Sequence, residues 1–172
     1  MANTIFEEKQ KFNQPWIRIC LVLLIAIFTW GFIQQVVMGI PFGNNPGPDW
    51  IFLPIFLLVG GLIIFFSSMK LITKVSKSGI SYCFTPFHSK EKLITWDRVK
   101  SAKVIDYRPI REYGGWGVRY GLKGKALNVR GKHGIEIEFF SGSNLLIGTQ
   151  KPEELKNTLK ELKESGVIAI NN

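Results

Sequence analysis

The chain carries two long apolar runs, WIRICLVLLIAIFTWGFIQQVVM (Trp16–Met38) and IFLPIFLLVGGLIIFFSSM (Ile51–Met69), and they decide its organisation. A helix of roughly 20 residues crosses a hydrocarbon core about 30 Å thick, and each run has about that length. The first run has one charge, Arg18, near its start, where a long side chain can reach the interface. The second run has none. We therefore expect two transmembrane helices over 16–38 and 51–69, joined by an outer loop over 39–50.

A cleavable signal peptide and a pair of buried helices are the alternatives to this interpretation. A signal peptide has an apolar region of about 7–15 residues before a small-residue cleavage site, whereas the first run is longer and ends in QQVVM. A soluble chain this short would hardly devote two all-round apolar helices to one core. The spans hold only Thr29, Gln34 and Gln35 as interior polar groups, which disfavours transport. Gly60-Gly61 is either a groove for the first helix or ordinary glycine in lipid.

The distribution of positive charge predicts the orientation of the two spans. The loop Gly39–Asp49 has no Lys or Arg, whereas the other flank of each span is basic, with Lys9 and Lys11 before the first span, Arg18 at its start, and Lys70, Lys74 and Lys77 after the second. The positive-inside rule then puts both termini in the cytoplasm. The sequence thus predicts a multi-pass protein of the cell (inner) membrane, with a cytoplasmic N-terminal segment (1–15) and a cytoplasmic domain (70–172).

Residues 70–172 form one small β-rich domain by their pattern. Ile135–Phe139 alternates apolar and acidic residues, as a half-buried antiparallel strand does. Gly- and Ser-rich turns separate the other strand candidates, and this spacing suggests a small barrel or two packed sheets. A helix over 152–165 closes the chain, with Leu155, Leu159 and Leu162 on one face, and capping an open barrel end is its simplest role. The further strand candidates are Leu71–Val75, Ile80–Thr85, Leu93–Trp96, Val99–Tyr107, Trp116–Tyr120, Lys125–Val129 and Leu145–Ile147.

Three stretches of this domain carry a family pattern: YGGWGVR (Tyr113–Arg119), ALNV (Ala126–Val129) with Gly131 and Gly134, and LIGTQKPEEL (Leu146–Leu155). Gly79–Tyr82, Pro86–His88 and Trp96 fit it as well. With its two preceding spans, the chain resembles small bacterial membrane proteins that have a pleckstrin-homology-like (PH-like) cytoplasmic domain. The resemblance implies an α+β membrane protein: a two-helix transmembrane hairpin, then a PH-like antiparallel barrel or sandwich of about seven strands capped by one C-terminal helix. Most such proteins are uncharacterised, so the resemblance brings no catalytic residues.

Catalytic, cofactor and metal sites are not expected from the sequence. The Gly-rich stretch Gly114–Gly134 misses the phosphate-loop pattern, because Ala126 follows Gly124-Lys125 and Arg119 stands where its first glycine would be. Two cysteines and two histidines, Cys20, Cys83, His88 and His133, are too few and too scattered for a disulfide framework or a zinc site. Hairpin turns are the ordinary explanation of the glycines.

A basic surface is the positive functional signal. From Ser101 to His133 there are eight Lys or Arg against Asp106 and Glu112, a net charge of six positive. In a domain tethered at a membrane, the nearest anionic partner is the lipid headgroup layer, worth about 1 kcal/mol per basic residue. Core packing is the more common place for Trp116, although a glycine-flanked turn also lets it reach the interface. The candidate lipid- or partner-binding residues are Arg108, Arg111, Trp116, Arg119, Lys123, Lys125, Arg130 and Lys132.

Three functions follow as hypotheses. The first is a non-enzymatic, membrane-anchored module that binds anionic inner-leaflet lipid or a protein partner through this basic surface. The second is a scaffold or assembly subunit that acts by self-association or by regulating a membrane complex, since open sheet edges can pair. The third is an enzyme acting on a membrane substrate. Nucleic acid is not expected as a partner, because the pI near 9.7 partly reflects the flanks of the spans and no binding motif is present.

Overall fold

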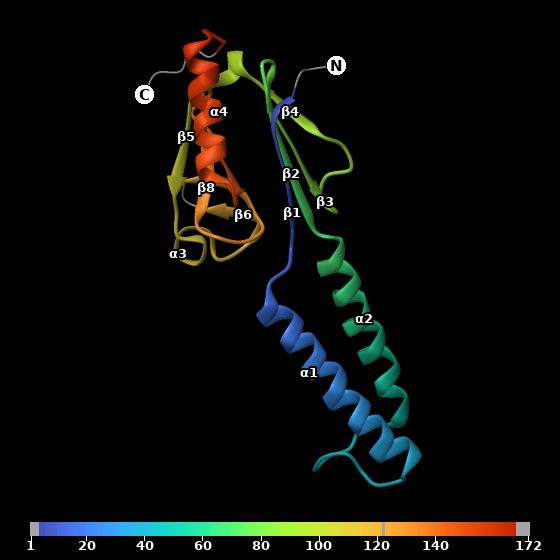
Figure 1. Cartoon of the computed structure of the whole chain (residues 1–172). Helices are drawn as coiled ribbons and strands as arrows, with labels where there is room; N and C mark the ends of the chain where they lie inside the picture. Colours follow the sequence, from blue (N-terminus) through green and yellow to red (C-terminus); the bar gives the residue numbers. More distant parts are fainter. Residues whose placement is uncertain (1–3, 122, 168–172) are drawn as a thin grey trace. The chain divides into compact units, whose positions relative to one another are not determined.

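The protein, described here from a computed structural model over residues 4–121 and 123–167, forms two compact units (Figure 1). Residues 13–68 form the helical unit. Of the described residues, 4–12, 69–121 and 123–167 form the β unit. The sequence sets residues 1–15 apart as a separate segment. The structure instead joins the residues before Phe12 to the β unit.

The helical unit consists of the two apolar runs. Helix α1 (Pro15–Phe32) begins with a proline in its first turn, where the missing N–H costs no hydrogen bond, and continues as a π-helical turn, η1 (Ile33–Val37). A 3₁₀ turn, η2 (Asp49–Ile51), leads into α2 (Phe52–Ser68). The combined segments Pro15–Val37 and Asp49–Ser68 have 23 and 20 residues and mean hydropathies of 2.3 and 2.5. They are long and apolar enough to span a membrane, at about 34 Å and 30 Å.

Aromatic rings and one glycine hold the helical unit together. The ring of Phe32 meets those of Phe52 and Phe56 edge-on, at centroid distances of 5.8 and 6.1 Å. A Cβ on Gly31 would lie 2.8 Å from the Phe42 ring, so a larger residue here would displace the Phe42 side chain. A Cβ on Gly60 or Gly61 would meet nothing within 4 Å, so these two glycines form no groove for the first helix.

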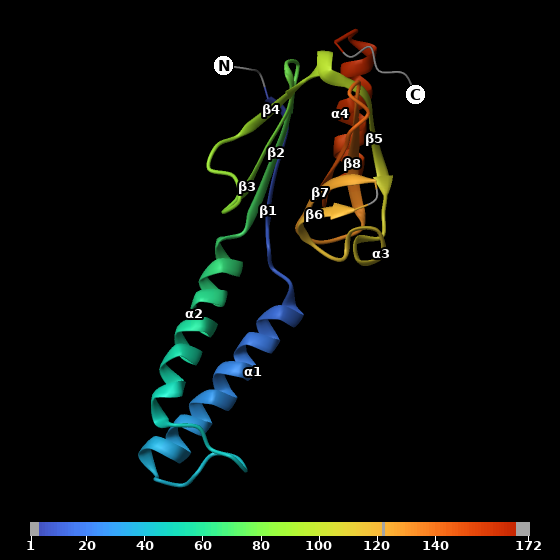
Figure 2. The same ribbon diagram turned by 180° about the vertical axis from the view of Figure 1, so that it is seen from behind.

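The described residues of the β unit form nine strands in two open sheets (Figures 1 and 2). The first sheet has the order β1-β2-β3-β4 and is antiparallel throughout. The second has the order β5-β8-β9-β7-β6, in which β7 and β9 pair in parallel. The bounds of the first sheet are β1 (Thr4–Lys11), β2 (Lys70–Ser76), β3 (Gly79–Thr85) and β4 (Lys92–Thr95). The bounds of the second are β5 (Val99–Asp106), β6 (Gly117–Gly121), β7 (Gly124–Asn128), β8 (His133–Phe139) and β9 (Asn144–Thr149).

Comparison with the sequence confirms an α+β protein with two apolar helices near its N-terminus, and all eight strand candidates are strands. The expected antiparallel barrel or sandwich of about seven strands differs from the structure in two respects. The second sheet is mixed because β9 returns beside β7 in the same direction, and β1 adds a ninth strand. Within the described residues, no backbone ladder joins the two sheets into a closed barrel.

Alternation places the core between the sheets. Ile135 and Ile137 of β8 are fully buried, whereas Glu136 and Glu138 between and beyond them point to the other face. Leu71 and Val75 of β2 and Phe84 of β3 are also fully buried. This solvated face for Glu136 and Glu138 is the one that the alternating sequence predicts.

Strand β1 links the two sheets by polar side chains. Its inward residues are Phe6, Glu8 and Gln10, all at most 5 % exposed. The Glu8 carboxylate accepts hydrogen bonds from Thr149 Oγ1 at 2.6 Å and from the Gln150 backbone N–H at 2.7 Å. Gln10 Nε2 donates to the Gly148 carbonyl at 2.7 Å. The N-terminal strand is therefore an integral part of the β unit, because its buried acid and amide form hydrogen bonds with β9 and with the residue after it.

The C-terminal helix α4 (Pro152–Glu164) packs against β1 and β5, the edge strands of the two sheets. A short 3₁₀ turn, η3 (Trp96–Arg98), and a short helix, α3 (Pro109–Tyr113), complete the unit. Leu155 and Leu162 of α4 are buried and Leu159 is half-buried, as the predicted stripe requires. The helix thus covers two sheet edges rather than the open end of a barrel.

Candidate functional site

The two connections between the β unit and the helical unit lie side by side in the first sheet. The chain leaves the β unit at Phe12 and returns at Met69, and the Phe12 N–H donates to the Met69 carbonyl at 3.0 Å. The last pair of the β1–β2 ladder is Lys11 opposite Lys70. Like charges directly opposite each other destabilise a strand pair. No acidic side chain among the described residues forms an ion pair with either lysine, so this end of the sheet carries uncompensated positive charge.

The neighbouring basic flanks are neutralised or lie elsewhere. Lys9 forms an ion pair with Glu7 at 3.0 Å, and Lys74 forms one with Glu91 at 3.1 Å. Lys77 lies in the β2–β3 turn, at the opposite end of the strands from Lys70. Only part of the basic flank is therefore free to bind an anion at the connections.

A chain of hydrogen bonds leads from β1 to the predicted basic surface. The residue held by Glu8 through its backbone, Gln150, also uses its side chain: it donates to the Arg130 carbonyl at 2.7 Å and accepts from Arg130 Nε at 3.1 Å. Next to Arg130, the Gly131 carbonyl accepts from the Trp116 indole at 3.2 Å. The Trp116 carbonyl in turn accepts from Arg119 Nε at 3.0 Å. These contacts fix the β7–β8 turn and the segment before β6 against each other.

Helix α3 is seated on the outer face of the second sheet. Its Tyr113 packs with Tyr107, Ala126 and Leu146 in a small buried cluster, and the two tyrosine rings meet edge-on at 6.0 Å. Burial raises the pKa of Tyr107 to about 12, and its hydroxyl accepts from Asn128 Nδ2 at 3.0 Å. A Cβ on Gly121 would lie 2.4 Å from the Glu112 carbonyl oxygen. Only glycine therefore lets α3 approach the sheet this closely.

The structure brings six of the eight predicted site residues together. Arg108 begins α3 directly after Tyr107, whose N–H donates to the Lys132 carbonyl at 2.8 Å, so α3 and the β7–β8 turn are adjacent. Trp116 is half-buried, neither in the core nor freely exposed. Among the described residues, Arg108, Arg111 and Lys132 form no ion pair and are exposed. We call the six the basic surface: Arg108, Arg111, Trp116, Arg119, Arg130 and Lys132.

The remaining two, Lys123 and Lys125, are engaged differently. Lys123 forms an ion pair with Glu112 at 3.0 Å. The Arg108 N–H, and then Lys123, hold the pKa of the Glu112 carboxyl below its ordinary value. Lys125 lies over the Tyr120 ring, 5.6 Å from its centroid.

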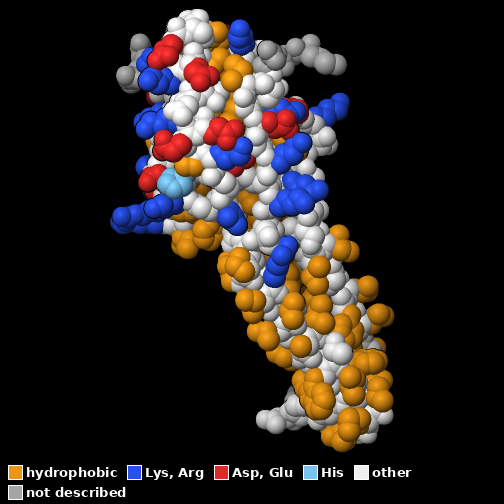
Figure 3. Space-filling view, viewed as in Figure 1, with side chains coloured by type: hydrophobic (Ala, Val, Ile, Leu, Met, Phe, Trp, Pro, Cys, Tyr) orange, Lys and Arg blue, Asp and Glu red, His pale blue; other side chains and the backbone are white. Residues whose placement is uncertain are grey.

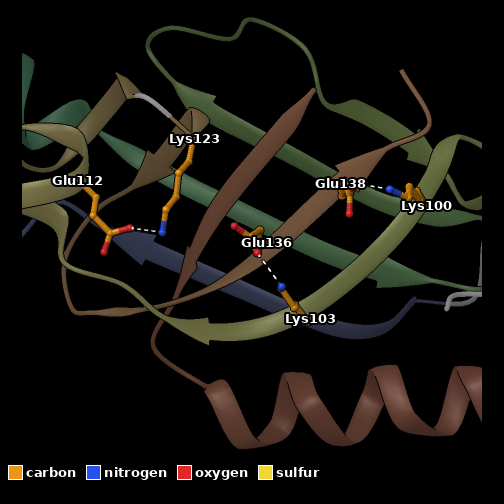
Figure 4. A network of polar contacts seen from close by, with 6 residues as sticks. All are labelled: Lys100, Lys103, Glu112, Lys123, Glu136 and Glu138. Atoms are coloured by element: carbon orange, nitrogen blue, oxygen red, sulfur yellow. Dashed lines mark hydrogen bonds and ion pairs between the residues drawn. The ribbon is translucent and has the colours of Figure 1, made fainter. Parts of the chain in front are cut away.

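Ion pairs neutralise the outer face of the second sheet (Figure 4). Lys100 pairs with Glu138 at 2.6 Å and Lys103 with Glu136 at 3.2 Å, beside the Lys123–Glu112 pair. On the face seen in Figure 3, acidic side chains are interspersed over the upper β unit, and Lys and Arg dominate its lowest part. The basic residues without an ion pair among the described residues include a cluster at the end of the β unit that holds Lys11, Lys70 and the basic surface, although Lys77 and Arg98 elsewhere in the unit are also unpaired.

Catalytic geometry is not apparent in the described part of the chain. An open depression of about 380 Å³ lies between the β6–β7 and β8–β9 turns, and its described lining contains Lys123 and Lys125 but no His, Cys, Asp or Glu. His88 is buried, its Nδ1 accepts from the Phe84 N–H at 3.2 Å, and burial lowers its pKa. No group of three or more metal-ligating side chains occurs among the described residues, and Cys20 and Cys83 are both free thiols.

The polar groups of the first apolar run hold the loop between the helices. Gln35 Nε2 donates to the Gly47 carbonyl and to Asp49 Oδ1, both at 2.7 Å. Gln34 makes a longer contact, 3.5 Å, with the Pro41 carbonyl. These two amides therefore have a structural role at the end of the run.

Three residues of the candidate site, Lys11, Lys70 and Gln150, were not indicated by the sequence. Lys11 and Lys70 looked like ordinary flanks of the spans, and their opposition appears only in the β1–β2 register. Gln150 stands in the sequence only as part of the stretch Leu146–Leu155, and its role depends on contacts with Glu8 and Arg130. The inward residues of β1 are one apolar and two polar side chains, Phe6, Glu8 and Gln10, so no alternation of apolar and polar residues revealed this strand.

Comparison with protein-family models finds no match for this chain, and comparison with curated proteins finds no match either.

Proposed function

We propose that this protein is a membrane-anchored, non-enzymatic module whose PH-like β unit binds anionic lipid headgroups at the inner face of the cell membrane. In this proposal α1 and α2 cross the membrane and both termini are cytoplasmic. The basic surface and the Lys11–Lys70 pair contact the headgroups. Open sheets and a helix on their edges agree with a PH-like architecture that is not closed into a barrel.

The observation that carries the proposal is the clustering of unpaired positive charge at the end of the β unit that continues into the helices. Lys11 and Lys70 oppose each other there, and Gln10, next to Lys11, bonds Gly148. A bilayer with anionic lipid supplies the counter-charge that the described residues do not. Each basic residue near such a surface contributes about 1 kcal/mol to binding. The three unpaired residues Arg108, Arg111 and Lys132 therefore contribute roughly 3 kcal/mol.

Exposed apolar side chains support the membrane anchor. Only 11 % of the most apolar window of each helix is buried, and Val22, Leu57 and Ile64 are 66 %, 68 % and 73 % exposed. A core helix of a soluble protein is mostly buried. The Gln34 and Gln35 side chains serve the connecting loop, which favours an anchor over a conduit.

Hydrogen exchange of the full chain in nanodiscs tests the lipid contact. Exchange of residues 106–121 and 123–133 is compared in neutral phosphatidylcholine and in discs containing phosphatidylglycerol. We expect anionic discs to slow exchange at low salt and high salt to remove the effect, because screening weakens exposed charge interactions. Equal exchange in both discs would overturn the proposal.

A matched pair of variants assigns the effect to the surface. Replacing Arg108, Arg130 and Lys132 by glutamine removes three charges from the basic surface. The control replaces three exposed basic residues elsewhere, Lys77, Arg98 and Lys156, and removes the same net charge. Only the first variant should lose the lipid effect. Protection of the same segment by a co-purifying protein, without an effect of lipid, would instead support the protein-partner hypothesis.

A further inference from the structure

One apolar side chain stands out on the basic surface. Ile110 of α3 is 69 % exposed and lies between Arg108 and Arg111 in the sequence. Single exposed apolar residues are common on protein surfaces, so exposure alone carries no conclusion. The rigid backbone beneath Ile110 and the position of α3 in the β unit are the observations that give this exposure a meaning.

The backbone under Ile110 is held on three sides. Tyr113, three residues on, is buried at 6 % exposure in the cluster with Tyr107. The Glu112 carboxylate accepts from the Arg108 N–H at 2.8 Å and from Lys123 at 3.0 Å, which closes the short helix on itself. Gly121 lets the helix lie directly on the sheet. With Tyr113 directed into the sheet and the helix fixed, Ile110 is displayed outward on a rigid support.

Helix α3 lies at the same end of the β unit as the connections to the helical unit. A Cβ on Gly148 would lie 3.4 Å from the Tyr107 hydroxyl, and the Gly148 carbonyl accepts from Gln10 on the opposite sheet. Tyr107 therefore lies level with the end of β1, and α3 follows it directly. Figures 1 and 2 both show α3 at the end of the β unit where β1 and β2 continue into the helices.

We propose that α3 is a membrane-inserting element in which Ile110 enters the boundary between headgroups and acyl chains while Arg108 and Arg111 bind lipid phosphates. This rests on the proposed function and adds penetration to headgroup contact. Arginines can keep their charged heads among the phosphates while an apolar neighbour is buried, the arrangement of interfacial amphipathic elements. Phe87 is a weaker candidate, because its ring packs edge-on against Phe84 at 5.5 Å.

The chain offers a closely matched control for Ile110. Phe140, in the turn after β8, is 70 % exposed. Its N–H donates to the Arg98 carbonyl at the start of β5, whereas α3 follows the end of the same strand. Eight residues of strand separate the two positions, roughly 25 Å. Equal exposure at opposite ends isolates the effect of position.

The test uses an environment-sensitive fluorophore, NBD, on the full chain in nanodiscs. Cys20 and Cys83 are replaced by serine, and Ile110→Cys, Lys132→Cys or Phe140→Cys carries the label. We expect NBD at position 110 to shift to shorter wavelength and to be quenched by doxyl groups on the acyl chains, in phosphatidylglycerol discs only. NBD at 140 should show neither change. NBD at 132 should respond to a quencher in the headgroup region only.

The outcomes separate the two proposals. A response at 132 without acyl-chain quenching at 110 would overturn insertion and leave headgroup binding standing. No response at either position would overturn both. In addition, Ile110→Ser should lower the ratio of membrane-bound to unbound β units by roughly tenfold or more, because the apolar contact with the bilayer is lost. The label at position 132 reports this ratio. Phe140→Ser should leave that ratio unchanged, and equal effects of the two substitutions would contradict the assignment.

Discussion

Truncation of one buried side chain near the N-terminus should destabilise the whole β unit. Phe6 of β1 is 2 % exposed and pairs with Val75 of β2. Lys151, at the start of α4, places its Nζ over the Phe6 ring, 5.8 Å from the centroid. Phe6→Ala removes the ring and leaves a cavity between the sheets and α4. Substitutions of this kind cost about 3–5 kcal/mol. Because a domain is typically stable by about 5–15 kcal/mol, the loss would be a large part of the total.

The adjacent residue supplies the control. Ile5 is 41 % exposed on the other face of the same strand, and partly exposed positions change stability much less, typically by about 0.5 kcal/mol. Phe6→Ala and Ile5→Ala therefore shorten side chains of the same strand and differ in the face of the strand that loses its side chain.

Native-state hydrogen exchange of the full chain in detergent measures the difference in stability between the two variants within the second sheet. The amides of Ile135 and Ile137 in β8 report on the second sheet, which β1 reaches only through side chains. The two losses differ by about 2.5–4.5 kcal/mol, so we expect these amides to exchange roughly fiftyfold faster or more in Phe6→Ala than in Ile5→Ala, since 1.4 kcal/mol is a factor of ten. Unchanged exchange in β8 would refute the inference that β1 is integral to both sheets.

Three other substitutions or titrations test individual contacts. Gly121→Ala forces a methyl group against the Glu112 carbonyl, so we expect a loss of about 1–3 kcal/mol in thermal unfolding and faster exchange in α3. The pKa of His88 is lowered from 6.5 chiefly by burial, so the stability present above that pH should decrease as the pH falls through the lowered value. The protection factor of the Phe84 amide, which corrects for the pH dependence of intrinsic exchange, should then fall below about pH 6.5, and His88→Asn should remove this dependence. The Tyr107 phenol should ionise near pH 12 in an absorbance titration, and Tyr107→Phe should abolish that step.

Local pattern was sufficient for most elements of the fold. The apolar runs predict α1 and α2 within a few residues, because composition and length alone define such helices. Period-two alternation predicts β8, and the proline and two acids followed by leucines four and three residues apart predict α4. Each of these signals lies within one short window of sequence.

The basic surface was predicted in composition and not in detail. The run Arg108–Lys132 identified six residues that the fold brings together, since they come from α3, from strand β6 and from the turns next to them. The pattern did not separate Lys123, which Glu112 neutralises, from unpaired Arg108 and Arg111. It also did not single out Ile110, because exposure depends on how α3 packs on the sheet.

The sequence by itself determined two apolar helices, eight strands, a closing amphipathic helix and a basic segment, because periodicity, length and charge are local properties. Only the tertiary structure decided that residues before the first helix form a ninth strand, that β7 and β9 run in parallel, and which charges remain unpaired. Glu8 shows the reason: its partner Thr149 is 141 positions away, so a polar residue in β1 becomes a core residue only when the chain folds. Such pairings between distant residues leave no trace in the local pattern.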